Sequence, residues 1–211
     1  MPLDVPLRWS LVIPVKVLAL AKSRLTGLTG PSRSELALAM AADTVAAACA
    51  AADSVIVVTD DDQARAELSG LGAVVVPDEP GDGLNPALRF GAALADERWP
   101  GRGRAGLAAD LPALGAAELG LALAAAAQAG QAFVADAAGT GTTLYTAGPG
   151  VAFCPKFGPA SRAAHLSAGA REINISGIDG LRRDVDTVAD LRDAARIGLG
   201  PRTAALTRDL A

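Results

Sequence analysis

Cysteine, histidine and aromatic residues are scarce in this sequence: its 211 residues include two cysteines, one histidine and 3% aromatics. Cys49 and Cys154 stand far apart and outside any CxxC pair, which disfavours a zinc site or redox couple and favours two small buried side chains. His165 has no cysteine or second histidine to share a metal with, and the sequence has no evident nucleophile elbow. We expect a structural or peripheral substrate role for His165, and no Ser-His-Asp triad.

An excess of positive charge is also absent, since the formal net charge is -4. Nucleic-acid binding needs a basic face or stripe, and the sequence has none. The opening MPLDVPLRW has no basic segment leading into an apolar run, which argues against a signal peptide. Polar side chains at Asp43, Asp53, Glu118 and Gln128 interrupt the alanine-rich stretches, which disfavours a membrane span. We expect a cytoplasmic protein with neither nucleic acid nor membrane as a partner.

What the sequence does have is apolar content, 51% of all residues, much of it alanine. The length suits a single domain over residues 1–211. Short apolar runs predict strands at residues 9–15, 54–58, 73–76, 105–109 and 132–135. Alanine-rich runs predict helices at residues 34–51, 62–69, 84–97, 118–128 and 161–168. This alternation predicts an α/β fold with a mostly parallel, doubly wound sheet.

The pattern changes after residue 140. The segment TTLYTA, residues 142–147, alternates as an antiparallel strand does, and short strands are expected around residues 172–175. We therefore expect one or two antiparallel strands added to the parallel core. In open α/β sheets ligands bind beyond the carboxyl ends of the strands. The residues that follow predicted strands there are Lys16, Asp60, Asp110 and Asp136.

A cluster of cations follows the first predicted strand, at Lys16, Lys22 and Arg24. The segment lacks the glycines of a Walker A or dinucleotide-binding motif. Three cations near one strand end can nevertheless neutralise a triphosphate. The alternative is a solvated basic surface loop.

Carboxylates occupy two positions suited to a metal ion. Asp110 directly follows an apolar strand, where a carboxylate either caps the next helix or holds a cation. Asp184 and Asp186 lie on one side of an extended segment, two residues apart. Thr187 and Asp190 resemble a capping box, so one of the two aspartates could be structural. Because Mg²⁺ takes one or two carboxylates together with phosphate oxygens, Asp110 and the D-x-D pair predict one magnesium site.

Two further segments are suited to binding anions. Residues 136–143 combine glycine and threonine, which offer N–H and hydroxyl donors, and Gly158 precedes a helix with Ser161 in its first turn. Helix N-termini bind phosphate and carboxylate groups. A third loop, residues 81–86, leads into a helix and places Asn85 for a nucleotide contact. Each of the three could instead be an ordinary turn.

Taken together, these segments resemble the guanylyltransferase family of coenzyme F-420 biosynthesis, the phosphoenolpyruvate or 2-phospho-L-lactate guanylyltransferases. The resemblance covers nearly the whole chain in order. The matching segments are IPVKVLALAKSRL (13–25), GLNPAL (83–88), ADLPAL (109–114), VADAAGTGTTL (134–144), KFGPAS (156–161) and RDVDTVADL (183–191). One departure is Ala109, where members of the family commonly have glycine.

The resemblance implies a single-domain nucleotidyltransferase fold of the GT-A-like type. It implies magnesium-dependent transfer of GMP from GTP to the phosphate of a small phosphorylated three-carbon acid, with release of pyrophosphate. The metal ligands implied are Asp110, Asp184 and Asp186, and the acceptor-binding residues are Thr142, Gly158 and Ser161. The nucleotide-binding residues expected are Lys16, Lys22, Arg24 and Asn85, and the catalytic residues are Asp110, Lys16 and Lys22.

Three alternatives stay open at this point. The acceptor could be phosphoenolpyruvate or 2-phospho-L-lactate; the alanine content is typical of a GC-rich genome, for which the resemblance favours phosphoenolpyruvate. A molybdenum-cofactor or sugar-phosphate nucleotidyltransferase would share the fold, but it usually opens with an LAGG-type glycine-rich segment where this chain has IPVK. A catalytically silent anion-binding α/β module would use the aspartates only as helix caps.

Overall fold

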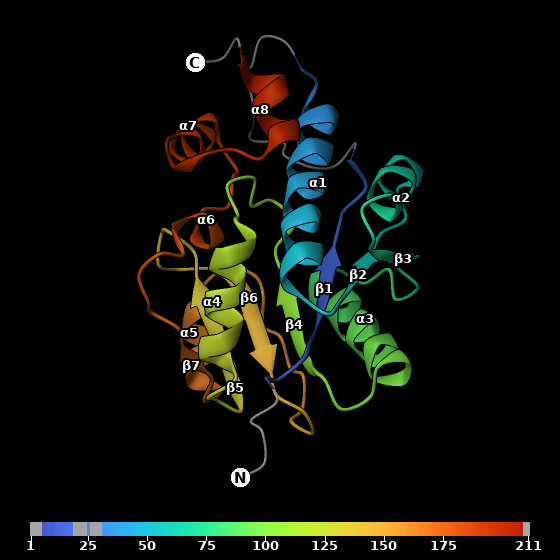
Figure 1. Ribbon diagram of the computed structural model, residues 1–211, viewed down its shortest axis with the longest axis vertical. Coiled ribbons are helices and arrows are strands. Elements are labelled where there is room, and N and C mark those ends of the chain that lie inside the picture. Colours follow the sequence, from blue (N-terminus) through green and yellow to red (C-terminus); the bar gives the residue numbers. More distant parts are fainter. Residues whose placement is uncertain (1–5, 19–24, 26–30, 209–211) are drawn as a thin grey trace.

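The computed structural model describes residues 6–18, 25 and 31–208, and these residues form a seven-stranded sheet (Figure 1). Its strands are β1 (Trp9–Pro14), β2 (Ser54–Val58), β3 (Val74–Val76), β4 (Gly103–Leu107), β5 (Gln131–Ala135), β6 (Thr142–Ala147) and β7 (Arg171–Glu172). The order across the sheet is β3-β2-β1-β4-β6-β5-β7. The mixed α/β architecture predicted from the sequence is confirmed.

The helices of the described residues cover both faces of this sheet. They are α1 (Arg33–Ala51), α2 (Asp62–Ser69), α3 (Leu84–Arg98), α4 (Ala116–Ala126), α5 (Ser161–Ser167), α6 (Asp179–Arg182), α7 (Val188–Ile197) and α8 (Pro201–Thr207). Capping residues explain two of the boundaries. The Ser32 side chain and Glu35 form a capping box that begins α1, and Glu118 accepts the Gly115 N–H at the start of α4. The helix expected from residue 118 therefore begins at Ala116.

The sheet is parallel except at one strand of the described chain. β1 pairs in parallel with β2 and β4, β2 with β3, and β5 with β7, whereas β6 runs antiparallel to both β4 and β5. The expected antiparallel strand is thus present. It lies inside the sheet between two parallel-oriented strands rather than at an edge, because the turn after β5 folds the chain back on itself.

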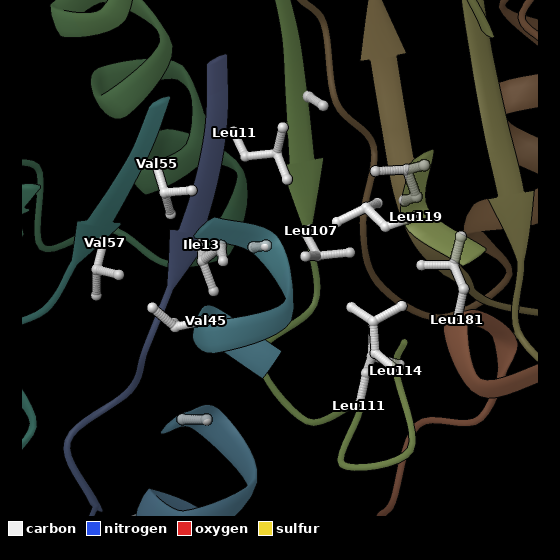
Figure 2. Packing of buried hydrophobic residues seen from close by; sticks show 14 of the residues in the cluster. Leu11, Ile13, Val45, Val55, Val57, Leu107, Leu111, Leu114, Leu119 and Leu181 are labelled. Carbon is white, nitrogen blue, oxygen red and sulfur yellow. The ribbon is translucent and has the colours of Figure 1, made fainter. Parts of the chain in front are cut away.

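Alternating side chains of the strands pack on opposite faces of the sheet. Figure 2 shows Leu11, Ile13, Val55 and Val57 on the face covered by α1. The intervening residues, such as Val12, pack against α3 on the other face. α1 is long and apolar enough to cross a membrane, yet it is a core helix here, and most of it is buried.

Two glycines inside helices give a matched test of this packing. A methyl group on Gly91 of α3 would overlap the Val12 side chain of β1, whereas one on Gly120 of α4 would meet no atom within 4 Å. We expect Gly91→Ala to lower the free energy of unfolding by about 1–3 kcal/mol through overpacking. Gly120→Ala should raise it by about 0.5–1 kcal/mol, because alanine loses less backbone entropy in a helix. Denaturant unfolding of the two variants checks both signs, and a stabilised Gly91→Ala would contradict the close approach of α3 to the sheet.

Candidate active site

Three strand ends meet at one edge of the sheet. β1 and β4 are parallel neighbours, so their carboxyl ends lie together, and antiparallel β6 begins at that same edge beside β4. Lys16 follows β1, Asp110 lies three residues beyond β4, and Thr142 is the first residue of β6. β4 ends at Leu107, so the expected strand 105–109 runs two residues too far. Ala108 and Ala109 instead form part of the cavity wall described next.

A cavity of about 710 Å³ opens at this edge of the sheet. Most of the site residues predicted from the sequence line it: Lys16, Asp110, Thr142, Gly158, Ser161, Asp184 and Asp186. The 81–86 segment contributes Leu84 to the lining but not the predicted Asn85. The cavity thus brings together segments that are as much as 170 residues apart, from Lys16 to Asp186. Lys22 and Arg24 lie outside the described residues, and their predicted roles stay predictions.

The acidic residues are brought together by a backbone contact. The Val185 N–H donates to the Asp110 carbonyl at 3.1 Å, which fixes the D-x-D segment beside the residue that follows β4. Asp184 is half-buried there. Burial first, and then the negative charges of Asp110, Asp136 and Asp186, together raise the pKa of Asp184 to about 7. The ionised form of Asp184 is therefore disfavoured in this cluster, and a bound cation would stabilise it.

The helix-capping alternative does not account for these aspartates. The helix after Asp110 begins at Ala116 and is capped at Gly115, five residues further along the chain. At α7 the Thr187 hydroxyl accepts the Asp190 N–H, and Asp190 accepts the N–H groups of Asp186 and Thr187. The capping box is thus formed by Thr187 and Asp190. The carboxylates of Asp110, Asp184 and Asp186 cap none of the described helices.

The donor chemistry of this cluster fits a hard divalent cation. Among the described residues, no group of three or more His, Cys, Asp or Glu side chains is placed so that it could hold a metal ion by itself. Mg²⁺ commonly takes one or two carboxylates and completes its octahedron with water and phosphate oxygens, so carboxylates of this cluster would hold it together with a bound phosphate. The surroundings of Asp184 disfavour its ionised form, and a bound cation would compensate that charge.

Asp136 is a part of the site to which the sequence assigned no role beyond its position after a strand. Its buried carboxylate accepts the N–H groups of Thr140 and Gly141, each at 2.8 Å. These bonds shape the turn that leads into β6, and a methyl group on Gly141 would collide with the carboxylate. Asp136 therefore positions the start of β6, where Thr142 faces the cavity.

His165 lies behind Thr142, fully buried in an aromatic cluster. Its ring stacks on Tyr145 and Phe133, with Phe157 edge-on. Nδ1 lies 3.0 Å from the Thr142 hydroxyl oxygen, and the Lys156 N–H donates to Nε2 at 2.9 Å. Burial lowers the pKa of His165 to about 4, and the positive charge of Lys156 contributes to the same shift. His165 is therefore neutral at pH 7.

Asn85 holds the loop that carries Gly158, a residue predicted to bind the acceptor. Its side-chain amide donates to the Phe157 carbonyl and accepts the Phe157 N–H, both at 2.8 Å. The side chain of Asn85 thus joins the start of α3 to a segment 72 residues later. The nucleotide contact expected of Asn85 stays a prediction.

The cavity as a whole combines charged, polar and apolar groups. Exposed Lys16 supplies positive charge, the aspartate cluster offers oxygen ligands, and the Thr142 end offers polar donors. Leu84, Leu88 and Phe157 add apolar surface. Such a cavity is suited to a phosphorylated ligand with a cation bound to it.

Comparison with known proteins gives concordant matches. A family model described as "Guanylyl transferase CofC like" matches residues 9–210. The phosphoenolpyruvate guanylyltransferase of Thermomonospora curvata is 64% identical over 205 residues, covering 96% of this chain and 90% of that protein. The protein of the same name from Streptomyces coelicolor is 54% identical, covering 97% of this chain and 98% of its own.

Solved structures share the fold at low sequence identity. A Desulfovibrio desulfuricans protein that carries the name of a nucleotide-diphospho-sugar transferase superposes with a TM-score of 0.71 at 17% identity, covering 95% of this chain and 94% of its own. A Mycobacterium tuberculosis protein solved in complex with manganese superposes with a TM-score of 0.57 at 18% identity, covering 90% and 98%. These likenesses support the nucleotidyltransferase-type fold.

Proposed function

Because the chain belongs to the family of CofC-like guanylyl transferases, we propose that it transfers GMP from GTP to the phosphate of phosphoenolpyruvate. The products are enolpyruvoyl-2-diphospho-5'-guanosine and pyrophosphate, and the reaction serves coenzyme F-420 biosynthesis. The observation that carries the proposal is the common cavity, in which an aspartate cluster lies among the residues predicted to hold nucleotide and acceptor. The names of the Thermomonospora and Streptomyces relatives support the choice of acceptor.

The reaction needs no general base from the protein. An oxygen of the acceptor phosphate, already ionised at neutral pH, attacks the α-phosphorus of GTP, and the bond from that phosphorus to the bridging oxygen of pyrophosphate breaks. The difficulty is that two anions must approach in line. The protein therefore has to align them and offset their repulsion, and electrostatic preorganisation is the usual way to do so.

We propose that residues near the carboxyl ends of β1 and β4 neutralise the charge of the substrate phosphates. Lys16 lies at the carboxyl end of β1 and would contact the triphosphate. Asp110, Asp184 and Asp186 would hold a divalent ion, with Mg²⁺ as our choice, and the manganese complex of the Mycobacterium tuberculosis neighbour supports a divalent metal. Bound there, Mg²⁺ would withdraw charge from the phosphate oxygens as the new bond forms. Lys22 and Arg24 would complete the triphosphate site.

We assign the acceptor to the part of the cavity that the start of β6 and the start of α5 line. Thr142 at the start of β6, Gly158 in the loop held by Asn85, and Ser161 at the start of α5 all line that part of the cavity. The Ser161 N–H donates to the Gly158 carbonyl at 3.1 Å, so the last two are joined in one turn. Polar donors held this way suit the phosphate and carboxylate of a three-carbon acid.

The purified protein tests this proposal directly. With GTP, Mg²⁺ and phosphoenolpyruvate, we expect steady release of pyrophosphate, lost when EDTA removes the metal. Replacing GTP by ATP tests the choice of base, and replacing the acceptor by 2-phospho-L-lactate tests the choice of acid. Faster turnover of 2-phospho-L-lactate would correct the acceptor, and no pyrophosphate release with any nucleotide would favour the silent anion-binding module.

A further inference from the structure

The hydrogen bonds of His165 determine which of its ring nitrogens carries the proton. The Lys156 N–H points at Nε2, and a backbone N–H can only donate, so Nε2 must accept and cannot be protonated. Burial has already lowered the pKa of this ring, which leaves it neutral with one proton. That proton is therefore on Nδ1. The Thr142 hydroxyl oxygen lies 3.0 Å from Nδ1 and can accept this proton.

This tautomer decides the direction of the bond to Thr142. Because Nδ1 is a donor, the Thr142 oxygen can only accept from it. A hydroxyl that accepts along one direction still has its own proton to donate elsewhere. Thr142 lines the cavity, on the side that we assign to the acceptor. The hydroxyl proton is thus available to an anion bound in the cavity.

We propose that His165 is a positioning residue that orients the Thr142 hydroxyl as a hydrogen-bond donor to the acceptor. The assignment of the acceptor to this side of the cavity rests on the proposed function. The ligand group that the oriented hydroxyl recognises is an anionic oxygen of a phosphate or carboxylate, which can only accept. His165 itself does not touch the acceptor.

The packing around the ring explains why the orientation would be maintained. Tyr145 and Phe133 stack on His165, and Phe157 contacts it edge-on, so the ring cannot rotate freely. A flipped ring would place Cδ2 where Nδ1 lies and Cε1 where Nε2 lies, so the Lys156 N–H would lose its acceptor and the Thr142 hydroxyl its donor. The same ring also joins β6, α5 and the 156–158 loop, which carry the predicted acceptor residues.

Two substitutions of the histidine separate the positioning role from a packing role. Asparagine can place its side-chain NH₂ where Nδ1–H lies but cannot reach the Lys156 N–H, whereas glutamine can reach the Lys156 N–H but has no donor at the Nδ1 position. We expect His165→Asn to keep the KM for phosphoenolpyruvate within about twofold. His165→Gln should raise that KM roughly tenfold, the usual scale for a lost hydrogen bond to an anion. The KM for GTP should stay unchanged in both variants.

A double-mutant cycle with Thr142→Val completes the test. Valine removes the hydroxyl at nearly constant volume, so Thr142→Val alone should raise the KM for phosphoenolpyruvate roughly tenfold or more. His165→Gln should add almost nothing in that background, because the hydroxyl that it orients is gone. Additive effects, or equal effects of Asn and Gln at position 165, would overturn the proposal and leave a packing role.

The tautomer can be measured without any substrate. ¹⁵N NMR of the ring in the wild-type protein should show a protonated Nδ1 and an unprotonated Nε2 at pH 7. A proton on Nε2 would overturn the inference even if the enzyme turns over phosphoenolpyruvate. An absence of turnover together with the expected tautomer would instead count against the proposed function alone.

Discussion

Replacing Asp110 by asparagine is expected to lower turnover by about 10²- to 10³-fold while leaving the protein folded. Asparagine keeps the size of the side chain and removes its negative charge, so the proposed cation, which would offset the repulsion between the two substrates, would lose a ligand. The fold should persist because Asp110 caps none of the described helices and its contact with Val185 uses its backbone carbonyl. Initial rates of pyrophosphate release at saturating GTP and Mg²⁺ measure the effect.

A matched control separates loss of a metal ligand from loss of one negative charge. Asp62 is exposed on α2 and does not line the cavity, so Asp62→Asn changes the net charge equally and should leave turnover within about twofold. Raising the Mg²⁺ concentration should recover part of the activity of Asp110→Asn, since a weakened site fills at higher metal concentration. Near-normal turnover of Asp110→Asn under the same conditions would refute its assignment as a ligand.

Much of this site could be predicted because ligands bind beyond the carboxyl ends of strands, and these strand ends can be recognised from a few neighbouring residues in the sequence. A short apolar run followed at once by a polar residue marks both a buried strand and the edge at which it ends, as for Lys16 and Asp136. The sheet then brings those edges together whatever lies between them in the chain. The pairing of Asp110 with residues 184–186 was predictable only as a combination of motifs, and the Val185–Asp110 hydrogen bond provides its physical basis.

The features that the sequence could not reveal depend on contacts between distant segments. The alternating TTLYTA pattern of β6 indicates an antiparallel strand, but it does not show which strands pair with it. The position of β6 between β4 and β5 is seen only in the structure. The bonds from Asn85 to Phe157 cross 72 residues and leave no local pattern. Likewise, the expectation of a structural or peripheral role for His165 could not include its contact with Thr142, because the aromatic cluster forms only in the folded chain.

Replacing Asp184 by asparagine is expected to stabilise the metal-free protein at neutral and alkaline pH while it lowers activity. In the folded protein burial and the neighbouring carboxylates raise the pKa of Asp184 to about 7, from 3.8 in a model compound. The folded state therefore keeps a proton that the unfolded chain releases, and stability falls as the pH rises from about 4 to about 7. At 1.36 kcal/mol per pKa unit, this one group costs on the order of 4 kcal/mol above pH 8. Asparagine has no such charge to bury.

The stability difference between Asp184→Asn and the wild-type protein should consequently depend on pH. In EDTA, urea unfolding should show a small difference near pH 4 and a growing advantage of the variant up to pH 8, whereas Asp62→Asn should show no comparable trend. Added Mg²⁺ should stabilise the wild-type protein more than Asp184→Asn, because a cation that binds only the folded state shifts the equilibrium toward it. An unchanged difference from pH 4 to 8 would contradict the acidic cluster, and equal stabilisation by Mg²⁺ would contradict Asp184 as a ligand. If Asp184→Asn gains stability in EDTA and loses activity, the cluster is maintained for the reaction at the expense of stability.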